Sequence, residues 1–389
     1  MTSALVAAVL LGAVPAQETK VDSAAVDAAI RKGAAYLKGG LGTGKPEDWG
    51  KEDETSILDL LLYALLHAGC ERDPHFQRAV QHMLKRRLSK TYCVAIQAMV
   101  LEELDRVKYQ GRILQCAQFL VDNQNTDGSW WYGTPSPLVE SMPSVAKDVA
   151  TPRKEAVLDF DAPTPSFPRR KPKVVRRLPV QQKRTVDSRG DNSNSQYAAL
   201  GLRACHDAGI VLPPEVIKRA QRWFLETQFT REGGWGYFRK DDGAAYGSMT
   251  VGAAGALAIY RHILNEPWKN DKAIVRGLDW VGRSFSVTAN PGFGDRNAEG
   301  QRHFTHHYYY LYGLERLGVL YGTERIGKHD WYAEGAASLL KSQAADGSWG
   351  EKDAVRNGGS DTIDTCFAIL FLKRATRPLV ESVDRFKKE

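Results

Sequence analysis

The sequence is poor in cysteine, with five thiols in 389 residues and no CxxC spacing. Scattered cysteines of this kind exclude the disulfide framework that staples small secreted domains. The chain is 43% hydrophobic and 25% charged, so it is able to bury a large core and is not disordered as a whole. We therefore expect buried thiols that act as small hydrophobes. The five residues are Cys70, Cys93, Cys116, Cys205 and Cys366.

Long apolar runs are also lacking. The run from Leu5 to Val14 is far shorter than the roughly 20 residues that span a bilayer. Val14 and Ala16 are small residues that frame a cleavage position after Ala16. We interpret residues 1–16 as a secretory signal peptide and expect export to the periplasm or the exterior. The alternative is a short buried N-terminal helix, since no Lys or Arg precedes the run.

Net positive charge is nearly absent outside one segment. Residues 133–190 hold twelve Lys or Arg and six Asp or Glu, which accounts for most of the net charge of +7. Nine prolines in the same segment forbid a continuous helix. We expect residues 133–190 to form a disordered insertion that is dispensable for folding. It is either a solvated loop without a partner or a weak contact with an anionic surface through residues 169–177, and no specific nucleic-acid binding is indicated.

An internal repeat runs through the rest of the chain. Three segments align without gaps and end in a glutamine that is followed by a glycine turn and a tryptophan, and three degraded copies complete a set of six. Once the 58-residue insertion is removed, the copies start 37 to 58 residues apart, which is typical of a two-helix repeat. The well-preserved pairs are Gln124 with Trp130, Gln228 with Trp235, and Gln343 with Trp349.

Each copy predicts two helices of different character. The first has one apolar stripe, and the second is apolar nearly all round and must be covered on most sides. This predicts an all-α protein, a single α/α toroid of six helical hairpins with the second helices inside. The hairpins occupy residues 17–132 and 191–376, and residues 377–389 form a polar tail. The N-terminal ends of the inner helices should gather at one mouth of the ring.

These motifs resemble the QW repeat of the squalene cyclase and protein prenyltransferase superfamily. That repeat combines Lys or Arg, Gly or Ala, an aromatic and an aliphatic residue, Gln, and then Gly-x-Trp, and residues 219–235 match it at nearly every position. The resemblance implies the toroid fold for the chain outside the insertion. The repeat glutamines should satisfy backbone groups at the ends of the first helices, and the tryptophans should fill the joints between hairpins.

The enzymatic motifs of this superfamily are incomplete here. Triterpene cyclases resembling this chain protonate an olefin with the middle acid of Asp-x-Asp-Asp-Thr, but residues 361–365 carry Ile363 at that position. Prenyltransferases hold zinc with an Asp-x-Cys pair and a later histidine. Asp364 and Cys366 have this spacing, but His307 precedes them, so the alternatives are a zinc site or a helix N-terminal charge beside a buried thiol.

The densest polar cluster should lie at the mouth of the ring, where the last two inner helices begin. Neighbouring inner helices pack about 8 to 10 Å apart, so their side chains can meet across the gap. Tyrosines of the same helix should line the cavity, or else fill the core with satisfied hydroxyls. The candidate catalytic residues are His306, His307, Asp361 and Asp364, and the candidate cavity-lining residues are Tyr309 and Tyr310.

Three functions remain open. The lack of complete catalytic motifs favours a binding scaffold whose central apolar cavity holds a lipid, an isoprenoid or a peptide, without standard cyclase chemistry. The superfamily resemblance favours an isoprenoid enzyme, either a terpene cyclase or a prenyltransferase relative. Export would also suit a polysaccharide lyase or glycosidase on a toroid, which needs a pair of carboxylates or a basic residue in an open cleft.

Overall fold

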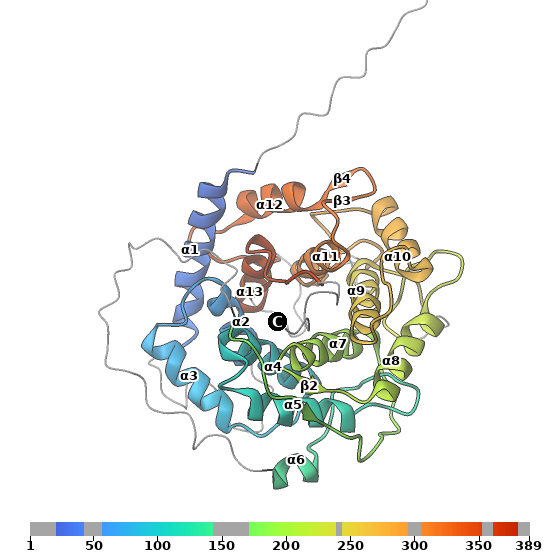
Figure 1. The fold of residues 1–389 in the computed structure, drawn as a ribbon. Helices are drawn as coiled ribbons and strands as arrows, with labels where there is room; N and C mark the ends of the chain where they lie inside the picture. Colours follow the sequence, from blue (N-terminus) through green and yellow to red (C-terminus); the bar gives the residue numbers. More distant parts are fainter. Residues whose placement is uncertain are drawn as a thin grey trace, which may run out of the picture.

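The computed structural model describes residues 21–42, 57–142, 171–238, 243–294, 305–351 and 361–379, and they form two concentric rings of helices (Figure 1). The outer helices are α1 (Ser23–Gly39), α3 (Pro74–Lys85), α5 (Gln110–Asp122), α8 (Pro214–Thr227), α10 (Lys272–Arg283) and α12 (Trp331–Ser342). The inner helices are α2 (Leu58–His67), α4 (Thr91–Asp105), α7 (Asn192–Asp207), α9 (Gly247–Ile263), α11 (His307–Tyr321) and α13 (Asp361–Leu372). The predicted all-α toroid is confirmed.

Minor elements decorate the ring. A short helix, α6 (Pro137–Ser141), lies between the two helices of the third repeat, α5 and α7. Strand β1 (Leu178–Pro179) pairs in parallel with β2 (Ile210–Val211), and β3 (Arg325–Ile326) pairs antiparallel with β4 (His329–Asp330). In the part of the chain that the structure describes, no helix is both long and apolar enough to cross a membrane.

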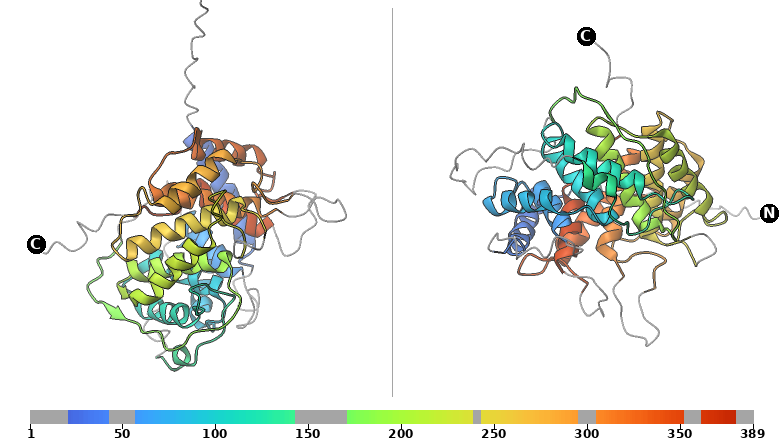
Figure 2. Two further views of the ribbon diagram at one scale, coloured as in Figure 1. Left: turned by 90° about the vertical axis from the view of Figure 1, so that its right-hand side faces the viewer. Right: turned by 90° about the horizontal axis from the view of Figure 1, so that it is seen from below.

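The two helix types follow from their apolar patterns. Outer helix α10 buries one stripe that includes Ile274, Gly277 and Val281, and the spacing of these residues places them on one helical face. Inner helix α9 buries nearly every residue, because it packs against α7, α10 and α11 at once. The two perpendicular views in Figure 2 show the helices stacked as a thick ring.

The three preserved tryptophans make the same joint. The indole Nε1 of Trp235 donates to the carbonyl of Phe224 at 2.8 Å, and the backbone N of Trp235 lies 3.1 Å from Thr250 Oγ1 on the following inner helix. All three indoles are fully buried. The other copies repeat both bonds at 2.8 to 2.9 Å, with Trp130 bound to Leu120 and Ser195 and Trp349 bound to Leu339 and Thr365.

The glutamines join each repeat to the next. Gln228 Nε2 donates to the carbonyl of Gly233 in its own turn at 2.7 Å and to that of Ala273 in the next outer helix at 2.8 Å. Gln124 does the same with Gly128 and Val216. Gln343 Nε2 donates to Gly347 and to Ala29, each at 2.9 Å. Because Ala29 belongs to α1, the last repeat closes on the first through the same contact.

A small residue in the next outer helix lets the tryptophan approach. A Cβ added at Gly277 would lie 2.9 Å from the Trp235 ring, and one added at Gly33 would lie 2.7 Å from the Trp349 ring. Both are closer than real Cβ contacts, so larger residues would push the hairpins apart. Glycine is therefore a packing requirement at these two joints.

The prediction of a disordered insertion is wrong for residues 133–142 and 171–190, which pack on the end of α5. Gln182 Nε2 donates to the Val121 carbonyl at 2.7 Å, and Lys183 N donates to Asp122 Oδ1 at 2.8 Å. The backbone N of Val186 donates to Gln124 O. This extended, proline-containing segment needs no helix of its own, because backbone and side-chain groups at the end of α5 provide its hydrogen-bond partners. Residues 143–170 lie outside the described part.

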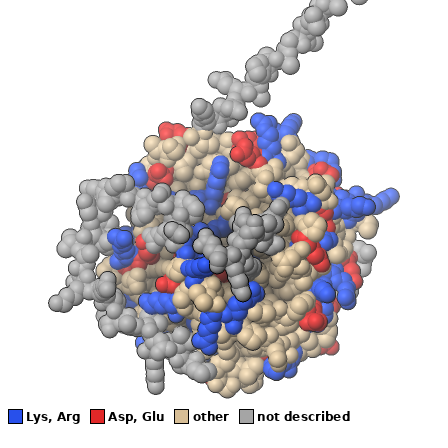
Figure 3. Space-filling view, in the orientation of Figure 1, with Lys and Arg blue, Asp and Glu red and all other residues tan. Residues whose placement is uncertain are grey.

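The basic cluster is also partly engaged within the molecule. Lys171 Nζ lies 2.5 Å from Glu103 Oε2 and pairs with Glu102 as well, and its side chain is only 9% exposed. Lys173, Arg176 and Arg177 are exposed, while residues 169–170 and the expected signal peptide lie outside the described part. Figure 3 shows Lys and Arg side chains gathered near the middle of the face in view.

The start of the expected polar tail is fixed. Arg377 Nε donates to Glu103 Oε2 at 3.0 Å, which ties residues after α13 to the end of α4. Residues 380–389 lie outside the described part. All five cysteines are free thiols; three are buried, and Cys70 and Cys93 are half-buried.

We expect Trp235→Ala to lower the free energy of unfolding by roughly 3 to 5 kcal/mol, because it removes a fully buried indole and its bond to Phe224. Denaturant unfolding measures this loss. Leu225→Ala, which truncates a residue of α8 that is 42% exposed, serves as the control and should cost under about 1 kcal/mol. Equal stability of the two variants would contradict the joint described above.

We expect Asp122→Ala to cost about 1 to 3 kcal/mol, because this buried carboxylate accepts bonds from both Lys183 N and Ser136 Oγ. The loss should also make the flanking segments susceptible to limited proteolysis. Asp127→Ala, in the neighbouring turn, leaves these two bonds intact and should not do so. Unchanged protease resistance in Asp122→Ala would show that residues 133–142 and 171–190 are held otherwise.

Candidate functional site

The mouth at the N-terminal ends of the inner helices is built in the same way in successive repeats. In three successive repeats, the loop that follows the outer helix runs over the start of the preceding inner helix and accepts a hydrogen bond from the first backbone N–H group of that helix. These bonds run from Thr91 N to Tyr132 O at 2.7 Å, from Asn192 N to Tyr237 O at 2.8 Å, and from Gly247 N to Pro291 O at 2.7 Å. The loops therefore satisfy helix ends and also carry aromatic side chains to the mouth.

These aromatic side chains form what we call the aromatic rim. Tyr237 and Phe238 meet edge to face at 4.8 Å between ring centroids, and Tyr246 meets Phe293 at 5.0 Å. The Arg189 guanidinium lies 3.7 Å from the centre of the Phe238 ring. All members of the rim are at least partly exposed, so their faces are available to a ligand. The rim consists of Trp131, Tyr132, Tyr237, Phe238, Tyr246 and Phe293.

A network of hydroxyls lies below the rim. Tyr92 OH donates to Ser193 Oγ at 2.5 Å, and Ser193 Oγ lies 2.9 Å from Tyr309 OH. Tyr309 is half-buried, stacks on Tyr197 at 6.1 Å and meets Phe367 at 5.5 Å. Aromatic side chains from α4, α7, α11 and α13 therefore pack together inside the ring.

A buried guanidinium lies deeper on the same helices. Arg316 Nη2 donates to Gln196 Oε1 at 2.7 Å, and its guanidinium carbon lies 4.5 Å from the centre of the Tyr312 ring. Arg316 and Gln196 line a small cavity between α7, α9 and α11, together with Leu200, Val251 and Gly252. Most of its wall is apolar, and Gln196 and Arg316 are its two polar lining residues.

Asp191 is the carboxyl group nearest to these features. It caps α7, accepting the backbone N of Asn194 at 2.6 Å and its side-chain amide at 2.8 Å. Burial raises the pKa of Asp191 to about 6, and burial, with a smaller contribution from the Asp191 charge, raises the pKa values of Tyr92 and Tyr237. Sequence reasoning missed this residue, although an aspartate three residues before Asn194 is a recognisable helix cap.

The candidate histidines lie at the start of α11, near the Phe293 end of the aromatic rim. His306 is exposed in a left-handed conformation with φ 58°, and its ring contacts Phe293 at 5.8 Å. His307 Nε2 lies 2.9 Å from the carbonyl of Val287, so its ring reaches the connection between α10 and α11. Tyr310 is fully buried and packs against Gly247 at the start of α9. Its ring fills the interface between α9 and α11.

The candidate aspartates differ from each other in exposure. Asp361 is exposed, whereas Asp364 is 1% exposed and accepts the backbone N of Glu351 at 3.4 Å. Glu351 caps α11, taking Thr305 N and His307 N at 2.8 Å each. Asp364 thus supports a loop that caps the preceding inner helix. The sequence feature that could have identified Glu351 is its position two residues after Trp349, because the same position in other repeats lies in a loop at the mouth of the ring.

The structure does not assemble the zinc set expected from Asp364, Cys366 and His307. Cys366 is buried, and burial raises its thiol pKa well above the ordinary value, so the neutral thiol persists. Within the described ranges, the ligand atoms of a different trio lie within 4.8 Å of one another, namely His206, Asp207 and His262. These residues lie near the opposite ends of the inner helices.

No protein-family model matches the sequence, and no curated protein matches it. Among solved structures, the chain is similar to a possible member of the GH105 family from Salmonella enterica serovar Paratyphi A. The two share 12% identity over 95% of this chain and 98% of that one, with a TM-score of 0.51. It is also similar to the apo type II terpene cyclase MstE from Scytonema, at 12% identity over 90% and 99%, with a TM-score of 0.46. At this identity the likeness concerns the toroid fold alone.

The raised pKa of Asp191 predicts a pH effect on stability. Its pKa is about 6 in the folded state, against an ordinary value of 3.8, so the folded state binds the proton more tightly and loses stability as pH rises from about 4 to 6. The loss can reach about 3 kcal/mol. Asp191→Asn removes this titration, so the variant should gain stability relative to the wild type across that range in denaturant unfolding. A pH-independent difference between the two would rule out the shifted pKa.

Proposed function

We propose that this chain is an exported binding scaffold of the squalene-cyclase-like and prenyltransferase-like repeat type, without standard cyclase chemistry, and that it binds a peptide at the aromatic rim. The observation that carries the proposal is the gathering of partly exposed aromatic rings from successive loops above the hydroxyls of Tyr92, Ser193 and Tyr309. Ring faces bind apolar side chains, while hydroxyls and loop backbone bind peptide groups.

A peptide fits this site better than a lipid or an isoprenoid. A lipid chain needs a roomy enclosed cavity, but the cavity between α7, α9 and α11 is small, and two of its lining residues are the hydrogen-bonded pair Gln196 and Arg316. The rim instead offers apolar faces and polar atoms side by side.

The isoprenoid-enzyme alternative is weaker for a second reason. The acid-donor position of a cyclase carries Ile363, and Asp364 supports the loop that caps α11. Cys366 is a buried neutral thiol rather than an exposed metal ligand. Neither chemistry is therefore supplied by the residues that the resemblance brings forward.

A carbohydrate-active enzyme is the second candidate, because Asp191 has the property of a general acid. A carboxyl group whose pKa is about 6 retains its proton in part near neutral pH, and Asp191 interacts electrostatically with Tyr92 and Tyr237. Its hydrogen bonds to Asn194 explain the same residue as a helix cap. An enzymatic activity that depends on Asp191 would distinguish a general acid from a helix cap.

The test compares ligand binding by two variants of the secreted protein. Binding to a random peptide array and a glycan array should show peptide ligands, and Tyr132→Ala with Tyr237→Ala should weaken their binding by about tenfold or more. Tyr332→Ala on α12, whose hydroxyl contacts the C-terminal end of α13 and so lies away from the mouth, is the matched control. Binding of glycans alone, lost together with their cleavage in Asp191→Asn, would favour the second candidate. Peptide binding that is unchanged in the rim variant would overturn the proposed site.

A further inference from the structure

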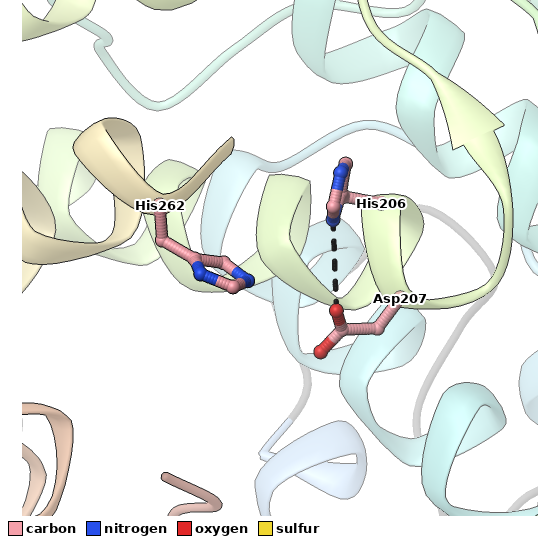
Figure 4. A group of neighbouring side chains, drawn as sticks. All are labelled: His206, Asp207 and His262. Carbon is pink, nitrogen blue, oxygen red and sulfur yellow. Dashed lines mark ion pairs between the residues drawn. The ribbon is translucent and has the colours of Figure 1, made fainter. Parts of the chain in front are cut away.

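The C-terminal ends of α7 and α9 bring two histidines and an aspartate together (Figure 4). His206 and Asp207 are the last two residues of α7, and His262 lies in the last turn of α9. One ligand atom from each residue lies within 4.8 Å of the others, and His206 Nδ1 lies 3.6 Å from Asp207 Oδ1. We propose that His206, Asp207 and His262 bind a zinc ion.

The ligand set suits this metal. Zinc accepts imidazole nitrogen and carboxylate oxygen at about 2.0 Å, which places tetrahedral ligand atoms about 3.3 Å apart. The observed separations need small side-chain rotations to reach this geometry. The side chains of His206 and Asp207 are 23% and 17% exposed, so a water molecule can reach the fourth position from solvent.

Two independent features support a cation at this place. His206 Nδ1 is buried and has no hydrogen-bond partner within the described structure, which is costly for an imidazole unless another partner is supplied. Both helices also end here, and the partial negative charge of their terminal carbonyls favours a cation.

A neighbouring arginine shapes the site as well. Arg203 Nε lies 3.5 Å from Asp207 Oδ2, whereas Oδ1 faces His206. The arginine thus holds one carboxylate oxygen and leaves the other for the metal, in the way that partners of metal ligands usually orient them. Bound zinc would tie the third inner helix to the fourth at the end opposite the aromatic rim.

The test uses the full mature chain after removal of metal with a chelator. Zinc titrated against a chromophoric competitor should bind at about one ion per chain. His206→Ala with His262→Ala should weaken binding by about tenfold or more. His75→Ala with His329→Ala, which removes two histidines elsewhere, should not. Equal loss in both pairs, or no loss in either, would mean adventitious binding only and would overturn the site.

A second measurement does not depend on the folding of the histidine variant. The Trp268 ring lies 5.6 Å from that of His262, so Co²⁺ in place of zinc should quench its fluorescence. The quenching should saturate at the same stoichiometry, fall markedly in Trp268→Phe, and be reversed by excess zinc. Quenching that is unchanged in Trp268→Phe would place the metal elsewhere.

Discussion

Closure of the ring depends on the indole that is buried between neighbouring hairpins. Trp235 binds the carbonyl of Phe224 in its own outer helix, and its ring leaves no room for a side chain at Gly277 of the next one. Gln228 completes the joint by bonding its own turn and the next helix. One short motif thus fixes both the inside of a hairpin and its relation to the following hairpin.

The same arrangement also determines the structure of the mouth. Because each loop after a joint covers the start of the preceding inner helix, the residues in these loops necessarily face the ring opening. Tyr132, Tyr237 and Glu351 show two solutions to the same need, since the tyrosines offer backbone carbonyls and the glutamate offers its side chain. If the proposed site is correct, these loops cap helices with one set of atoms and contact the ligand with another.

The fold could be predicted because its determinants are local and repeated. The glutamine, the glycine turn and the tryptophan recur at a readable period, and the apolar patterns distinguish inner from outer helices. The site could not be predicted in the same way. Asp191 approaches Tyr92 and Tyr237 only through tertiary packing, so no spacing in the sequence connects them. His307 was placed at the correct end of its helix, but the direction of its side chain depends on Val287 in a separate connection.

Composition misled the prediction for residues 171–190 for a related reason. Proline and like charge do oppose a helix, yet Gln182 and Lys183 need only the end of α5 to bind. This segment is ordered by its contacts with a neighbouring helix, and such contacts produce no periodic pattern in the sequence. The contact between Gln343 and Ala29 has a wider consequence. The last repeat contacts the first in the same way as other repeats contact the next, so the ring has no structural break where the chain begins and ends. Circularly permuted chains opened between other hairpins would therefore retain the same set of interfaces.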